Sequence, residues 1–190
     1  MKKLFLTLAV VAVAVTSCQD SKEGFDGFDV IDNPFEELIG SQQGDFDKEE
    51  LEKQLYECAF VHEICYEKIN NGWTVYSMIG GICDYGFVVD EGVMTSYAGN
   101  PPFVSDGKTA CDFRYSSETA TIYTVNKCYD GKEYAAKVVY YKDGYVVFEG
   151  CLPFSYSYSY NYAPGTYLYK GYFSKEKKKE WKNSDHWVER

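Results

Sequence analysis

Residues 134–152 read YAAKVVYYKDGYVVFEGCL, two runs rich in valine and tyrosine on either side of Asp143-Gly144. Such runs joined by Asp-Gly predict a β-hairpin with a two-residue turn. Side chains alternate between the two faces of a strand, so a charged residue that points to water also orients its neighbours. With Lys137 and Glu149 outward, the residues expected to face inward are Ala136, Val138, Tyr140, Val146, Phe148 and Leu152.

The same rhythm runs through most of the chain, where short apolar and aromatic runs alternate with turn residues such as Asn70-Asn71-Gly72 and Asp90-Glu91-Gly92. The strands expected from it are 59–69, 73–79, 83–89, 93–98, 109–115, 120–127, 134–141, 145–152 and 166–174. Successive hairpins predict an all-β fold, an antiparallel up-and-down meander of about eight or nine strands. A meander of this length closes most economically into a barrel, because closure leaves no free edge. The alternative is a β-sandwich.

One short helix is expected before the strands, over residues 47–55. Asp45 or Asp47 can accept hydrogen bonds from its first backbone amides, and acidic residues fill its first turn. Leu51 and Leu55 fall on one face, which is the apolar side that such a helix buries.

The first 18 residues have the three parts of a secretory signal. Met1-Lys2-Lys3 is basic, Leu4 to Val15 is uncharged and apolar, and Val15-Thr16-Ser17-Cys18 follows. This last stretch resembles the lipobox of bacterial lipoproteins, in which cleavage before the cysteine is followed by its acylation. The resemblance implies a lipid-modified Cys18 and a protein anchored to the outer membrane, on a face that the sequence leaves open.

These features divide the chain into a signal peptide (1–17), a flexible acidic tether (18–45), a β domain (46–175) and a charged tail (176–190). The formal net charge of the whole chain is −10, from 19 basic and 29 acidic residues. Removing Lys2 and Lys3 with the signal peptide leaves 17 − 29 = −12. Nucleic acid is excluded as a partner, because phosphate binding needs basic patches.

Six cysteines remain besides Cys18. An even number in an exported chain predicts disulfides, and the sequence does not choose among the fifteen ways of pairing six cysteines. A metal site is the weaker alternative, because zinc sites usually contain close Cys-x-x-Cys pairs and the chain has only two histidines, His62 and His186. No metal or cofactor is expected, and the disulfide candidates are Cys58, Cys65, Cys83, Cys111, Cys128 and Cys151.

Serine and tyrosine alternate through residues 155–160, and a strand there would carry tyrosines on one face. Tyrosine has a large apolar body and a polar tip, which suits surfaces that bind sugars or proteins. The alternative is that these rings complete the core or cover the end of the barrel. Trp73 has the same two possible roles: it binds a ligand, or it fills one end of the barrel interior. The candidate binding residues are Tyr156, Tyr158, Tyr160, Tyr162 and Trp73.

Taken together, the chain resembles the lipocalin-like lipoproteins of gut anaerobic bacteria, most of which have no assigned function. The matching stretches are the lipobox, the acidic spacer, Phe46–Leu51, Asp90–Tyr97, Phe113–Thr119, Lys137–Val139 and Val147–Gly150. The resemblance implies a small barrel displayed from a membrane. No nucleophile–base set is evident, so we expect a protein that is not an enzyme and binds a small apolar ligand or a glycan. The alternative is a structural lipoprotein that docks an envelope or surface protein.

Overall fold

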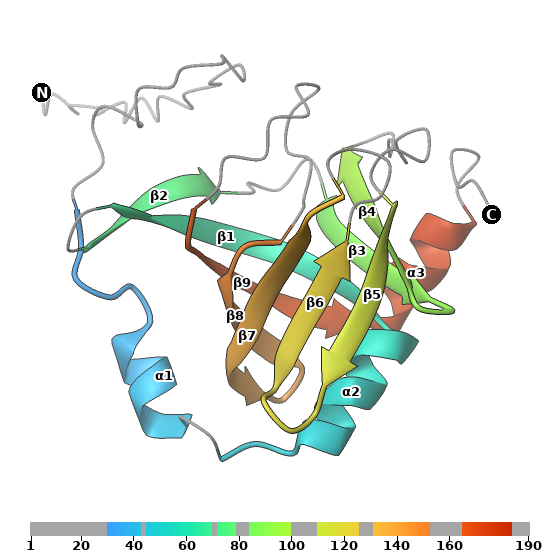
Figure 1. The fold of residues 1–190 in the computed structure, drawn as a ribbon, viewed down its shortest axis with the longest axis horizontal. Coiled ribbons are helices and arrows are strands. Elements are labelled where there is room, and N and C mark those ends of the chain that lie inside the picture. Colours follow the sequence, from blue (N-terminus) through green and yellow to red (C-terminus); the bar gives the residue numbers. More distant parts are fainter. Residues whose placement is uncertain are drawn as a thin grey trace, which may run out of the picture.

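The computed structural model describes residues 30–42, 45–69, 72–78, 84–99, 110–125, 131–152 and 165–183. These residues form one antiparallel sheet and three short helices (Figure 1). The strands are β1 (Ala59–Ile69), β2 (Gly72–Met78), β3 (Asp84–Asp90), β4 (Val93–Gly99), β5 (Ala110–Ser116), β6 (Thr121–Val125), β7 (Glu133–Lys142), β8 (Tyr145–Gly150) and β9 (Tyr167–Ser174). The helices are α1 (Glu36–Gln42), α2 (Lys48–Glu57) and α3 (Lys175–Lys182).

The sheet closes because β1 pairs with β9 as well as with β3. Eight strands, β1 and β3 to β9, form the ring, and β2 is an extra strand that pairs with the second half of β1. From β3 to β9 each strand pairs with the next one in sequence, so the predicted up-and-down meander barrel is confirmed and the sandwich alternative is wrong. The nine predicted strands match the observed ones to within two residues at each end.

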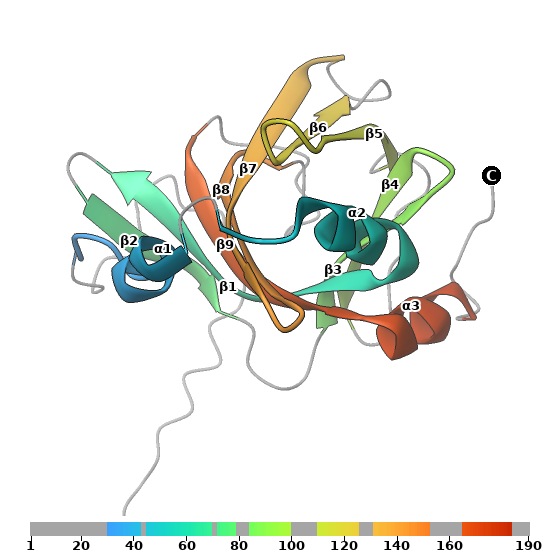
Figure 2. The ribbon, with the colours of Figure 1, turned by 90° about the horizontal axis from the view of Figure 1, so that it is seen from below.

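One end of the barrel has tight turns and a helix across it, and we call it the helix end. The turns Glu91-Gly92 and Asp143-Gly144 have positive φ at both residues, 49° and 77° in the first and 51° and 83° in the second. Two-residue turns with positive φ match the right-handed twist of the strands that they join. Figure 2 views the barrel from this side, with α2 within the outline of the strands.

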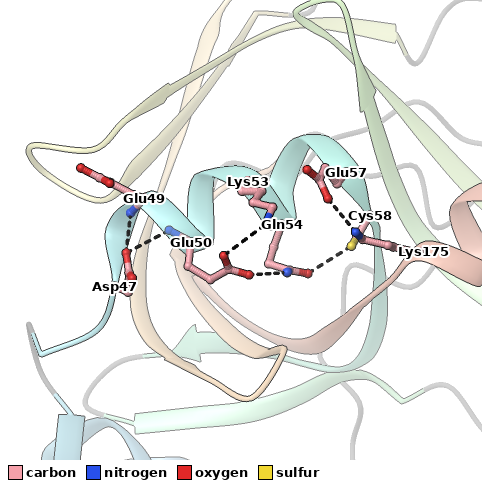
Figure 3. Close-up of polar contacts among 8 residues, drawn as sticks. All are labelled: Asp47, Glu49, Glu50, Lys53, Gln54, Glu57, Cys58 and Lys175. Carbon is pink, nitrogen blue, oxygen red and sulfur yellow. Dashed lines mark hydrogen bonds and ion pairs between the residues drawn. The ribbon is translucent and has the colours of Figure 1, made fainter.

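Helix α2 begins where the sequence predicts. The Asp47 side chain accepts hydrogen bonds from the amides of Glu49 and Glu50, at 3.0 and 2.9 Å (Figure 3). Its apolar face carries Leu51 and Leu55, which are both fully buried in the barrel core. A helix of ten residues is marginal by itself, so this burial is what stabilises it.

The barrel interior next to α2 is filled by aromatic rings. Phe60 lies 5.1 Å from both Phe87 and Phe148, centroid to centroid, and 6.2 Å from Phe173. Phe60, Phe87 and Phe148 are at most 1% exposed. This half of the barrel is therefore a packed core.

The faces predicted for 134–152 are confirmed with one exception. Ala136, Val138, Val146, Phe148 and Leu152 belong to the inner core, as expected. The prediction for Tyr140 is wrong, because its side chain packs on the outside of the barrel and Tyr141 points inward instead. The cause is a register shift between Val138 and Tyr140 where β7 pairs with β8, since one extra residue reverses the alternation.

Two apolar clusters cover the outside of the barrel. Near α1, Trp73 packs with Phe35, Val139, Val147 and Leu168, so Trp73 is buried on the outer surface and does not plug the barrel. On the other side, Trp181 of α3 is fully buried and stacks on Tyr97, with ring centroids 4.1 Å apart and planes at 8°.

Helix α3 comes from the segment expected to be a charged tail. Its Lys178 ammonium donates to the carbonyls of Tyr56 and Val89, at 2.6 and 2.9 Å, and pairs with Asp90 at 2.9 Å. Gly86 leaves room for both β1 and α3, because a Cβ there would overlap the Phe60 carbonyl and lie 3.0 Å from the Trp181 ring. Lys175 and Glu57 form a further ion pair at 2.7 Å between α3 and α2 (Figure 3).

The four described cysteines do not form the predicted disulfides. Cys58, Cys65, Cys111 and Cys151 are thiols in the structure. In the strand pairs described, no cysteine lies opposite another: Cys65 faces Ser77 and Tyr169, and Cys111 faces Met94. A disulfide needs Cα atoms within about 7 Å, so an even count of cysteines does not suffice. Cys83 and Cys128 lie outside the described residues.

Several predicted features fall on residues that the structure does not describe. They are the signal peptide 1–17, Cys18, the tether as far as residue 29, His186, and Tyr156, Tyr158, Tyr160 and Tyr162. Among the described helices, none has the length and apolar character needed to span a bilayer.

Candidate functional site

The end of the barrel opposite α2 differs in its connections, and we call it the loop end. Here β4, β6 and β8 end and β5, β7 and β9 begin. The connections between them are 100–109, 126–132 and 151–166, against turns of two to four residues at the helix end. Barrels commonly carry binding residues at the end with long connections, because loop residues vary without disturbing the strands.

The barrel wall also divides at this end. The first part of β1 pairs with β3, through residues 59–61, whereas its second part pairs with β2, through residues 64–69. Among the described residues no pairing joins β2 to β3. The inward face of the second part of β1 is therefore bordered by β9 and β2.

Five side chains meet on that face, and we call them the mouth cluster: Cys65, Glu67, Tyr76, Cys151 and Tyr167. Glu67 lies directly opposite Tyr167 in the β1–β9 pair, so both side chains point to the same side. The rings of Tyr76 and Tyr167 meet edge to face, 5.2 Å apart. Cys65 and Tyr167 are buried, whereas Glu67, Tyr76 and Cys151 are partly exposed, so the cluster has a solvent-facing side.

Glu67 is the charged member of the cluster. The Tyr167 hydroxyl donates a hydrogen bond to its carboxylate, which favours the charged form. Burial has the larger effect and raises the pKa of Glu67 above its usual value. The described residues include no lysine or arginine paired with Glu67, although its sequence neighbour Lys68 lies over the outward-facing Trp73 ring, 5.5 Å from the centroid.

The other members of the cluster are neutral near pH 7. Burial raises the pKa of the Cys65 thiol well above its usual value, and it also raises the pKa of Cys151. Nucleophilic cysteines need the opposite shift, so these thiols do not suit covalent catalysis. Burial likewise raises the pKa values of Tyr76 and Tyr167, which leaves their hydroxyls as neutral hydrogen-bond donors.

Further polar groups line the barrel between the two ends. His62 is 1% exposed and lies edge to face with Tyr169, 6.4 Å away; burial lowers its pKa to about 4. The Ser96 and Thr124 hydroxyls are buried, and no hydrogen-bond partner for either lies within the described structure. A buried hydroxyl without a partner costs about 1–3 kcal/mol, so such groups in a native protein call for an explanation.

Sequence reasoning missed the mouth cluster and proposed Trp73, which the structure buries on the outside of the barrel. A signal existed, since Cys65 and Glu67 are two residues apart in a strand and so share a face. A register shift in β1 between His62 and Ile64, where it pairs with β9, hid which face that was. Within the described ranges no three potential ligand residues are grouped to hold a metal ion.

Comparisons of the chain with models of protein families, with curated proteins and with solved structures found no match.

Proposed function

We propose that this protein is a non-enzymatic binding protein that takes a small ligand or a glycan at the loop end of its barrel. The mouth cluster carries the proposal, because it combines the partly exposed Tyr76 ring, the buried Tyr167 ring and the partly exposed Glu67 carboxylate on one face. Rings supply apolar contact area, and a few polar groups orient the ligand, as in most small-molecule sites. The filled core beside α2 argues for a site at the loop end and against one deep in the barrel.

The test is a titration of the purified full-length chain with a panel of glycans and small amphiphiles, followed by tyrosine and tryptophan fluorescence. We expect a saturable change for at least one class of ligand, weakened in Tyr76→Leu because that ring borders the site. Tyr145→Leu is the matched control, because Tyr145 is 47% exposed and lies at the helix end. A response that is absent, or equal in both variants, would overturn the proposal.

The proposed setting is the outer membrane, with the barrel held by acyl chains on Cys18 as in lipocalin-like lipoproteins. Support comes from the basic, apolar and small-residue parts of the first 18 residues. Cys18→Ala should move the protein from the membrane fraction to the soluble fraction, since cleavage and acylation both need that cysteine. Unchanged membrane association of the variant would contradict the anchor.

A second candidate is a structural lipoprotein that docks an envelope or surface protein. The observation in its favour is the packed ring cluster of Phe60, Phe87, Phe148 and Phe173, which fills the half of the barrel next to α2. Affinity capture from membranes should then recover a stoichiometric partner, and serine substitutions of Tyr156, Tyr158 and Tyr160 should release it. This outcome, with no response to the ligand panel, would replace the first proposal.

A further inference from the structure

Glu67 is a carboxylate on the inward face of a barrel, and the neighbouring cations point the other way. Lys68 follows it in the strand and lies over the outward-facing Trp73 ring. Lys170 lies on the adjacent strand β9 and pairs with the outward Glu63 at 3.3 Å. The sheet itself separates both ammonium groups from Glu67, since alternate residues of a strand face opposite sides.

A tyrosine ring contacts this carboxylate, and two further tyrosine rings pack against that one. The Tyr167 hydroxyl donates a hydrogen bond to Glu67. The centroids of the Tyr76 and Tyr169 rings lie 5.2 and 5.8 Å from that of the Tyr167 ring. A ring face attracts a cation through its quadrupole, and groups of aromatic rings bind quaternary ammonium ions in this way. A carboxylate beside such rings adds a charged partner for the ammonium group. The same chain places Arg114 over the Tyr123 ring at 4.0 Å on its outer surface.

The net charge of the whole chain also favours a cationic ligand over an anionic one. The formal net charge is −10, so the average field draws cations towards the protein and repels anions. A ligand with an anionic group would have to approach both this field and the Glu67 carboxylate.

We infer that the mouth cluster binds an organic cation, a primary or quaternary ammonium group attached to an apolar or aromatic body. The ammonium group pairs with Glu67 and lies against the tyrosine rings, and the apolar body contacts the partly exposed edge of Tyr76. This inference rests on the proposed function, since it names the ligand class of the same site.

Three probes of similar size separate the charge of the ligand from its apolar body: 2-phenylethylammonium, 2-phenylethanol and 3-phenylpropionate. Calorimetric titration of the full-length chain at pH 7 should show the ammonium ion binding at least about tenfold more tightly than the alcohol, as a charge-assisted contact implies. The carboxylate should bind most weakly. Equal affinities for the ammonium ion and the alcohol would overturn the inference and leave the proposed function standing.

Glu67→Gln tests the residue itself. It should remove the preference for the ammonium ion and leave the affinity for 2-phenylethanol unchanged. Glu63→Gln is the matched control, because it removes the same charge from the outward face of the same strand. A preference that survives in Glu67→Gln, or is lost equally in Glu63→Gln, would overturn the inference.

The dependence of binding on pH gives a readout that a merely structural role would not move. Affinity for the ammonium ion should fall as pH drops through the pKa of Glu67, which burial raises above its usual value. Affinity for the alcohol should stay flat over the same range. If none of the three probes binds, the cation inference fails, and the glycan and amphiphile panel decides the proposed function separately.

Discussion

The two ends of this barrel are built on opposite principles. At the helix end, turns are short, α2 buries Leu51 and Leu55, and Lys178 satisfies the carbonyls of Tyr56 and Val89. At the loop end, a carboxylate with no cation from the described chain lies among tyrosines, one buried thiol and one partly exposed thiol. The first arrangement lowers the free energy of the folded state. The second raises it, because a partly buried charge has no cationic partner, and a bound cation offsets that cost.

The contrast between the two ends indicates where in this barrel a functional site is to be sought. Packing and satisfied polar groups identify the part that holds the fold together. Other polar groups are less well satisfied. Glu67 accepts a hydrogen bond from Tyr167 but pairs with no cation among the described residues, and the Ser96 and Thr124 hydroxyls have no hydrogen-bond partner there. Such groups mark the part of the barrel whose side chains are not explained by stability alone. Variants at the two ends should therefore separate stability from binding.

The largest expected effect is at α3, which starts at the helix end and packs on the outside of the barrel. Trp181→Ala removes a fully buried ring that stacks on Tyr97 and detaches α3, so we expect a loss of about 3–5 kcal/mol in the free energy of unfolding. Urea denaturation measures it, with Tyr145→Ala as an exposed aromatic control expected to stay within about 1 kcal/mol. Binding at the loop end, measured below the denaturation midpoint, should be unchanged. A weakened affinity would mean that the two ends are coupled.

The next effect concerns His62, which lies between the ends. Its folded pKa of about 4 is below the ordinary value of 6.5, so the unfolded chain binds the extra proton first as pH falls. The stability from a neutral His62 is complete above pH 6.5 and is lost between pH 6.5 and 4, by roughly 3 kcal/mol. Urea denaturation across this range should show that loss in the wild type and a flatter profile in His62→Leu. Parallel profiles would contradict the assignment.

The smallest effect again lies at the helix end. Asp47→Ala removes the cap that accepts from the Glu49 and Glu50 amides, which should cost about 1 kcal/mol. Asp45→Ala removes a nearby exposed carboxylate that makes no capping bond, so its thermal midpoint should match that of the wild type. Equal shifts in both variants would point to a general charge effect and would weaken the contrast between the ends.

Much of the fold followed from local chemistry. Asp47 caps α2, Glu91-Gly92 and Asp143-Gly144 form the turns, and alternation oriented Val146, Phe148 and Leu152 correctly. The predicted inward direction of Tyr140 was wrong, because a run of valines and tyrosines gives no local sign of the register shift in β7. The four described cysteines are thiols, so the disulfide prediction has no support among them, and an even number of cysteines is not by itself evidence of pairing.

The strands, their turns and the capped helix were predictable from the sequence alone, because each depends on residues close together in the chain. Closure of the barrel depends on the pairing of β1 with β9, which lie far apart in the chain. Only the tertiary structure decided which side chains share a face across strands: Glu67 with Tyr167 and Tyr76, Trp181 with Tyr97, and Trp73 on the outside of the barrel. The physical reason is that strand register and bulges arise when distant segments pair and pack. A one-residue change in register turns every following side chain to the other face.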